Sequence, residues 1–125
     1  MSLGKVLAVD DEVYMLRILE FSLTAEGFEV ITANNGELAI EKARQEKPDI
    51  IVLDTMMPVL NGYETCRRIK YDPETKAIPV VLLVIRGRGI DKRLGSEVGA
   101  TDYIVKPFSP NRLIERIQEL LDIRK

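Results

Sequence analysis

Two short apolar runs of this chain end in carboxylates, and that placement needs a chemical explanation. The run "LAVDDE" leads into Asp10 and Asp11, and the run "IIVLD" ends at Asp54. Like charges repel one another and lose hydration when they leave water, so acids grouped at the ends of buried segments are unfavourable by themselves. A divalent cation that prefers oxygen ligands, such as Mg²⁺, offsets this penalty. The sequence therefore predicts a hard-metal site.

A lysine adds a positive charge that could bind phosphate beside these acids. Lys106 directly follows another apolar run, "YIV", and comes directly before Pro107. If the strands that carry these residues are neighbours, three carboxylates and one ammonium group converge in one shallow pocket. Mg²⁺ pairs with phosphoryl oxygens, and a lysine provides a mobile point charge for phosphate. A carboxylate in this setting can act as a nucleophile and form an aspartyl phosphate.

The composition narrows the classes of function. The 125 residues contain no histidine and one cysteine, which excludes Ser-His-Asp triads, imidazole metal sites, intramolecular disulfides and thiolate clusters within the chain. The formal net charge of −2 gives no electrostatic case for nucleic-acid or membrane binding. No apolar run reaches membrane-spanning length, and the first residues lack a signal-peptide core, so we expect a cytoplasmic protein.

Five apolar runs alternate with amphipathic stretches and indicate the elements that position the acids and the lysine. Most of these runs do not alternate with polar residues, which is typical of strands buried on both faces of a parallel sheet. The expected strands are Val6–Val9, Val30–Thr32, Ile50–Leu53, Val80–Ile85 and Tyr103–Val105. The expected helices are Val13–Glu26, Glu37–Glu46, Tyr63–Tyr71, Ile90–Val98 and a last helix that starts at Pro110 after the N-cap Ser109. This pattern predicts an α/β doubly wound sheet, with ligands bound beyond the carboxyl ends of the strands.

Several of these side chains also have purely structural explanations. Cys66 lies at helical spacing from Tyr63 and Ile69, so we interpret it as a small core residue. Asp11, taken alone, also fits the N-cap of the first helix. Glu12 is expected in the first helical turn, where an acid interacts favourably with the helix dipole. Capping does not explain acids at two strand ends together with Lys-Pro at a third.

The stretches "VDDE", "LDTMMPVLNG" and "GATDYIVKPF", with their spacing, resemble the receiver domain of two-component response regulators from end to end of the chain. The resemblance implies a flavodoxin-like fold with five helices and strand order 2-1-3-4-5, in a single receiver domain over residues 1–125 with no output domain. Residues 1–4 are interpreted as a partly disordered or cloning-derived start. Pro58 and Gly62 fit the family's loop after the acceptor.

The same resemblance implies roles for the acidic residues. Asp54 is the phosphoacceptor, and the donor is a histidine of a partner kinase or of a histidine phosphotransfer protein. Asp11 and Asp54 ligate Mg²⁺, for which Mn²⁺ is the alternative ion. Asp10 acts through water, and the backbone carbonyl of Met56 completes the protein ligands.

Further implications concern the fifth strand and the partners. Lys106 contacts the phosphoryl oxygens, and its peptide bond to Pro107 is cis, a state confined largely to proline. Downstream effectors of the family bind the face formed by the fourth helix, the fifth strand and the fifth helix, and a homodimer is a further assembly that the sequence leaves open. The domain transfers and hydrolyses only its own phosphoryl group, so we do not expect an enzyme.

The chain departs from the family at the end of the fourth strand. The family has Thr or Ser there, followed by a small residue, and the hydroxyl group bonds the phosphoryl group. This chain has Val84, which donates no hydrogen bond, and then Ile85, whose bulk is expected to crowd the entrance to the acceptor. The family's aromatic residue on the fifth strand is present as Tyr103. We therefore predict an atypical switch with weakened activation.

Two groups of residues outside the acidic site each have two interpretations. Arg86 and Arg88 either reach the phosphoryl group in place of the missing hydroxyl or, as is more common for such loops, remain solvated. A second apolar stripe of the first helix, Tyr14, Ile18 and Phe21, either packs under the last helix, which is the more common arrangement, or docks against a helix of the phosphodonor.

Three other functions compete with the phosphoacceptor. A receiver-fold interaction module that signals without phosphorylation is favoured by Val84 and Ile85 and opposed by the complete acid–lysine set. A phosphatase with an aspartyl nucleophile needs a second acid two residues after the nucleophile, where Met56 stands. A flavin or nucleotide binder needs a Gly- or hydroxyl-rich loop after the first strand, where the chain has "DDEVYM".

Overall fold

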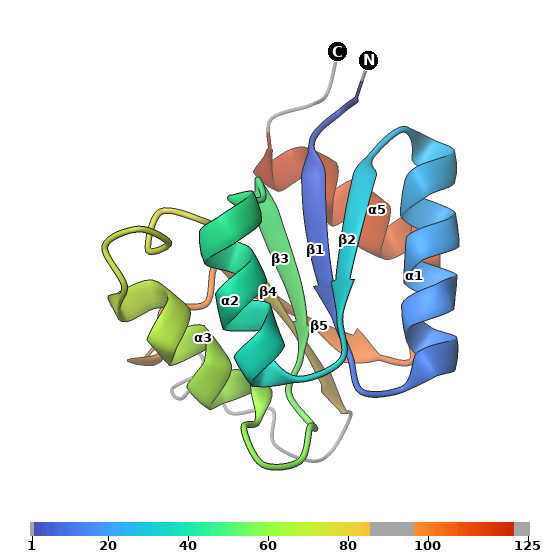
Figure 1. Ribbon diagram of the computed structural model, residues 1–125. Helices are drawn as coiled ribbons and strands as arrows, with labels where there is room; N and C mark the ends of the chain where they lie inside the picture. The colour runs from blue at the N-terminus through green and yellow to red at the C-terminus, as the bar shows by residue number, and fades with distance from the viewer. Residues whose placement is uncertain (1, 86–96, 122–125) are drawn as a thin grey trace.

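The computed structural model describes residues 2–85 and 97–121 (Figure 1). The elements follow the order β1 (Lys5–Val9), α1 (Val13–Glu26), β2 (Glu29–Ala33), α2 (Gly36–Glu46), β3 (Ile50–Asp54), α3 (Gly62–Tyr71), β4 (Val80–Ile85), β5 (Asp102–Lys106) and α5 (Pro110–Leu120). The helix expected over Ile90–Val98 lies almost entirely outside the described residues. The described part of the chain therefore shows four of the five expected helices.

The five strands form one parallel sheet with the order β2-β1-β3-β4-β5, as the resemblance implied. Val9 at the end of β1 lies between Ala33 of β2 and Leu53 of β3. Asp54 pairs in register with Leu83 of β4. Because all strands run the same way, their carboxyl ends meet along one edge of the sheet, where the acids are expected.

Helices cover both faces of the sheet, which confirms the doubly wound architecture (Figure 1). On one face, Leu19 and Leu23 of α1 and Leu113 and Ile117 of α5 pack in one buried cluster with alternate strand residues. On the other face, the buried cluster contains residues of α2 and α3 together with the remaining strand positions. All five residues of β3 are buried, so the apolar run "IIVL" has no exposed face.

The helix ends follow local sequence signals. Gly27 ends α1 in the left-handed region at φ +114°, and Ser109 accepts a hydrogen bond from the Arg112 amide before Pro110. Asn35 and Asn61 cap α2 and α3 in the same way, so these helices begin one residue earlier than the apolar spacing predicted.

Three expectations about the N-terminal part need revision or comment. Glu12 is the N-cap residue of α1 and makes no side-chain capping bond, so its expected place in the first helical turn was wrong. The stripe on α1 does not pack under the last helix, because Tyr14, Ile18 and Phe21 are 83%, 48% and 76% exposed. Residues 2–4, expected to be a partly disordered start, include the Leu3 amide, which donates to the Gly27 carbonyl at 2.9 Å.

Among the described helices, none is both long and apolar enough to cross a membrane.

Cys66 is buried in α3, as expected, and its thiol donates to the Val98 carbonyl at 3.5 Å. Burial raises the pKa of this thiol to about 12, and the charge of Lys70 acts in the opposite direction. The thiol is therefore a packing group at neutral pH.

Candidate functional site

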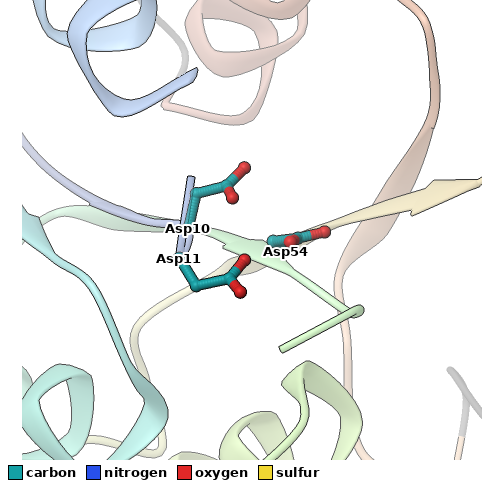
Figure 2. Close-up of side chains that lie close together, drawn as sticks. All are labelled: Asp10, Asp11 and Asp54. Atoms are coloured by element: carbon teal, nitrogen blue, oxygen red, sulfur yellow. The ribbon is translucent and has the colours of Figure 1, made fainter. Parts of the chain in front are cut away.

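The carboxyl ends of β1 and β3 bring the three predicted acids together. Asp10 and Asp11 follow β1 directly, and Asp54 is the last residue of β3. One carboxylate oxygen of each residue lies within 4.8 Å of the others. Figure 2 shows the three side chains gathered at these strand ends, with the carboxylate of Asp11 directed toward Asp54. The side chains of Asp10 and Asp54 are buried, whereas Asp11 is exposed.

Lys106 at the end of β5 bridges the two buried carboxylates. Its ammonium nitrogen lies 3.3 Å from Oδ2 of Asp10 and 3.2 Å from Oδ1 of Asp54. The Lys106 side chain is 18% exposed, so the contact is only partly screened by solvent. One ammonium group does not balance three carboxylates, and the cluster keeps an excess of negative charge at neutral pH.

The surroundings of Asp10 and Lys106 change the pKa values of both side chains. Burial raises the pKa of Asp10 to about 6, and the nearby charge of Asp54 acts in the same direction. The Glu12 amide donates to Oδ1 of Asp10 at 3.0 Å and, together with Lys106, opposes the rise. For Lys106, burial acts to lower the pKa, but the two carboxylates outweigh it and the pKa is raised. The ammonium group therefore stays charged while Asp10 is held in an unfavourable environment.

The loop after β3 is packed closely against the acceptor strand. The Met56 amide donates to Oδ1 of Asp54 at 3.3 Å, and the Gly62 amide donates to the Thr55 carbonyl at 3.2 Å. A Cβ atom at Gly62 would lie 2.2 Å from the backbone oxygen of Asp54, so only glycine fits there. The glycine of "LNG" thus brings the first turn of α3 onto the end of β3.

Val59 in the same loop was not identified from the sequence. It has φ +67° and is fully exposed, and the Leu60 amide donates to the Pro58 carbonyl across it at 2.7 Å. A β-branched residue in the left-handed region is strained, and such strain is found most often at functional loops. No pattern of residue types predicts a positive φ at a valine.

The residues that depart from the family occupy the end of β4. Val84 is 2% exposed and lies on the sheet face that α2 and α3 cover, where partly buried Tyr103 also packs. The register places Ile85 beside Lys106. The side chain of Ile85, and all of Arg86 and Arg88, lie outside the described residues. The Lys106–Pro107 peptide bond is cis, as the resemblance implied.

The donor set of the cluster fits a hard divalent ion. Three carboxylates with oxygens within 4.8 Å of one another suit Mg²⁺ or Mn²⁺, which bind oxygen ligands and favour an excess of negative charge. The Met56 backbone lies next to Asp54, since its amide donates to Oδ1 of that residue at 3.3 Å. The role of the Met56 carbonyl as a ligand stays a prediction. The chain has no histidine, so it offers no imidazole ligand for a transition-metal ion.

Most of the chain matches known proteins in sequence. Residues 6–118 match the family model described as the response regulator receiver domain. The chain is 47% identical over 117 residues to the probable transcriptional regulator ycf27 of Pyropia yezoensis, covering 94% of this chain and 47% of the relative. The chain thus spans about half the length of such curated relatives.

Solved structures give the same result. Chemotaxis protein CheY4 of Vibrio cholerae matches with a TM-score of 0.88 and 35% identity, covering 94% of this chain and 98% of that one. The receiver domain of sensor histidine kinase PA1611 from Pseudomonas aeruginosa PAO1 matches with a TM-score of 0.86 and 26% identity, covering 95% and 98%. That structure has a magnesium ion coordinated in its active-site cleft.

Replacing the buried acid Asp10 should relieve the repulsion in this cluster. In the presence of a chelator at pH 7.5, Asp10→Asn is expected to raise the free energy of unfolding by about 1 kcal/mol, because a neutral amide avoids the burial of a charge. The pKa of Asp10 is higher in the folded protein than its ordinary value of 3.8, so the folded state takes up the extra proton as the pH falls. The free energy of unfolding of the wild type should therefore gain this contribution as the pH falls from roughly 7 to 4. The variant has no carboxyl group at position 10, so its free energy of unfolding should lack this gain.

Urea unfolding at several pH values measures the difference. Asp11→Asn is the matched control, because it removes the neighbouring charge at an exposed position and should change the pH dependence little. A lower stability of Asp10→Asn than of the wild type at pH 7.5 would contradict the electrostatic account of the cluster.

Proposed function

This chain belongs to the response regulator receiver domain family, and from that premise we propose that it accepts a phosphoryl group on Asp54 in a two-component system. The observation that carries the proposal is the bridge from the Lys106 ammonium group to Asp10 and Asp54, at 3.3 and 3.2 Å. It places a phosphate-binding charge beside the buried carboxylate of Asp54. Asp11 and Asp54 would hold Mg²⁺ with the Met56 carbonyl, and Asp10 would act through water.

The transfer step follows from this arrangement. A carboxylate oxygen of Asp54 attacks the phosphorus atom of a phosphohistidine on the partner. The new O–P bond forms as the P–N bond breaks, and the electron pair stays on the imidazole nitrogen, which takes up a proton. Lys106 neutralises the charge of the phosphoryl oxygens, and the Met56 amide orients the Asp54 carboxylate through its hydrogen bond. Bound Mg²⁺ would supply further neutralisation between the carboxylates and the phosphoryl group.

The α1 surface supports a helical phosphodonor as the partner. Tyr14, Ile18 and Phe21 form an exposed apolar stripe on the helix that begins beside the acids. Such a stripe suits docking of a helix from a histidine kinase or a histidine phosphotransfer protein. We further propose that effectors, or a second copy of the chain, bind around β5 and α5. The domain acts on its own phosphoryl group and is not an enzyme in the usual sense.

An interaction module without phosphorylation is the second candidate, and Val84 is the observation that favours it. The buried Val84 side chain offers no hydrogen bond to a phosphoryl group. Loss of a hydrogen bond to a charged group removes about 1.5–3 kcal/mol of coupling between phosphate and loop. A population shift from 1:99 to 99:1 requires about 5.5 kcal/mol, so the switch is weakened even where transfer is intact.

Incubation with Mg²⁺ and acetyl phosphate tests the acceptor directly. Intact mass spectrometry should show a single phosphoryl adduct on the wild type and none on Asp54→Asn, which keeps the shape of the side chain but lacks the nucleophile. An adduct on both proteins would place the phosphoryl group elsewhere. If Mg²⁺ binds and neither acetyl phosphate nor a histidine-phosphorylated protein produces an adduct, the interaction module is the better account.

Restoring a hydroxyl at position 84 tests the account of the switch. Val84→Thr should destabilise the unphosphorylated protein by about 1–2 kcal/mol, because it buries a hydroxyl group without a charged acceptor. Phosphorylation supplies the acceptor, so the change in amide hydrogen exchange on phosphorylation should be larger than in the wild type. Val81→Thr is the control, since Val81 is buried on the opposite face of β4. An unchanged response of Val84→Thr to phosphorylation would show that the missing hydroxyl does not limit the switch.

A further inference from the structure

Thr55, the residue directly after the acceptor, uses every one of its polar groups to join three elements. Its amide and its hydroxyl both donate to the Leu83 carbonyl of β4, at 3.1 and 2.9 Å. Its carbonyl accepts from the Gly62 amide at the start of α3, at 3.2 Å. The residue is 4% exposed, so water competes little for these bonds. Thr55 therefore ties the end of β3 to β4 on one side and to α3 on the other.

Thr55 stands between the two residues that carry the proposed nucleophile and the proposed carbonyl ligand. Asp54, which precedes it, carries the acceptor carboxylate, and Met56, which follows it, carries the proposed carbonyl ligand. A rotation of the backbone at Thr55 would move both oxygens relative to Lys106. Metal binding and phosphoryl transfer require the ligands to stay within about 0.5 Å of the productive geometry.

Close packing of α3 also restricts the movement of the backbone at Asp54 and Thr55. An added Cβ at Gly62 would meet the Asp54 oxygen at 2.2 Å and the Thr55 Cα at 2.6 Å, so α3 lies directly against these two residues. The hydroxyl bond to the Leu83 carbonyl holds Thr55 from the side of β4. The main-chain bonds are available to any residue at position 55, whereas the second bond to Leu83 needs a hydroxyl group.

We propose that the Thr55 hydroxyl is a positioning group for metal binding and phosphoryl transfer, acting by fixing the end of β3 to β4. The inference rests on the proposed function of Asp54. Thr55 does not contact the phosphoryl group, because its hydroxyl points to the Leu83 carbonyl. It also links the acceptor to β4 one residue before Val84, at the place where this chain lacks the hydroxyl of its family.

The test compares the same chemical change at two buried threonines. Thr55→Val removes the hydroxyl at nearly constant volume, and Thr55→Ser retains it. Thr75→Val is the matched control: Thr75 is 1% exposed, and its hydroxyl also donates to a backbone carbonyl, that of Ile69, at 2.6 Å. Thr75 follows the end of α3 that is opposite Gly62, so it lies away from the acids.

Two quantities are measured on each protein: the dissociation constant for Mg²⁺ by isothermal titration calorimetry, and the rate of adduct formation with acetyl phosphate by intact mass. Thr55→Val should bind Mg²⁺ about tenfold more weakly and form the adduct about tenfold more slowly, since small misplacement of reacting groups has effects of this size. Thr55→Ser should stay within about twofold of the wild type. Thr75→Val should do so too, even if its unfolding free energy falls as much as that of Thr55→Val.

Equal Mg²⁺ dissociation constants and equal adduct-formation rates for Thr55→Val and Thr75→Val would overturn the inference. A Thr55→Ser protein that binds Mg²⁺ as weakly and reacts as slowly as Thr55→Val would also overturn it. If Thr55→Val does not fold, Thr55→Ala removes the same hydroxyl and is judged by the same comparison. A wild type that neither binds Mg²⁺ nor forms the adduct would contradict the proposed function instead, so the two failures are distinguishable.

Discussion

The mutual repulsion of three carboxylates at one edge of a parallel sheet is the constraint on which the rest of this structure depends. Their oxygens lie within 4.8 Å of one another, and burial raises the pKa of Asp10 to about 6. Lys106 offsets part of the charge by bridging Asp10 and Asp54. An excess of negative charge in the folded state favours a bound cation, and in the proposed function that cation would also help to neutralise the phosphoryl group.

The strand order of the sheet places the charged residues at one edge. Adjacent placement of β1 and β3 puts Asp10, Asp11 and Asp54 at one edge, and the last strand in the order β2-β1-β3-β4-β5 brings Lys106 to the same edge. The first turn of α3 then lies on the acceptor strand, because Gly62 has no Cβ atom. The three acids therefore lie at the ends of β1 and β3, whose residues are almost all buried, and such strands do not easily move apart to relieve repulsion.

The sequence predicted most of the strands and helices, because buried parallel strands and amphipathic helices leave distinct patterns. The strand order came from the family resemblance and not from periodicity. The sequence left both packing and docking open for the stripe of Tyr14, Ile18 and Phe21, because helical spacing does not reveal whether a neighbour covers a face. Asp10 and Asp11 are adjacent in the sequence, and only the structure shows that one is buried and the other exposed. Thr55 was missed since its bonds to β4 and α3 are tertiary contacts without a local pattern.

The dependence of unfolding free energy on Mg²⁺ concentration, at constant ionic strength, tests the central claim most directly. The account predicts that stability rises by about 1.4 kcal/mol for each tenfold increase of free Mg²⁺ above its dissociation constant, because the ion binds the folded carboxylate cluster and not the unfolded chain. A stability that is the same in Mg²⁺ and in Na⁺ of equal ionic strength would contradict it, because the three carboxylates would then be tolerated without the cation that their arrangement requires.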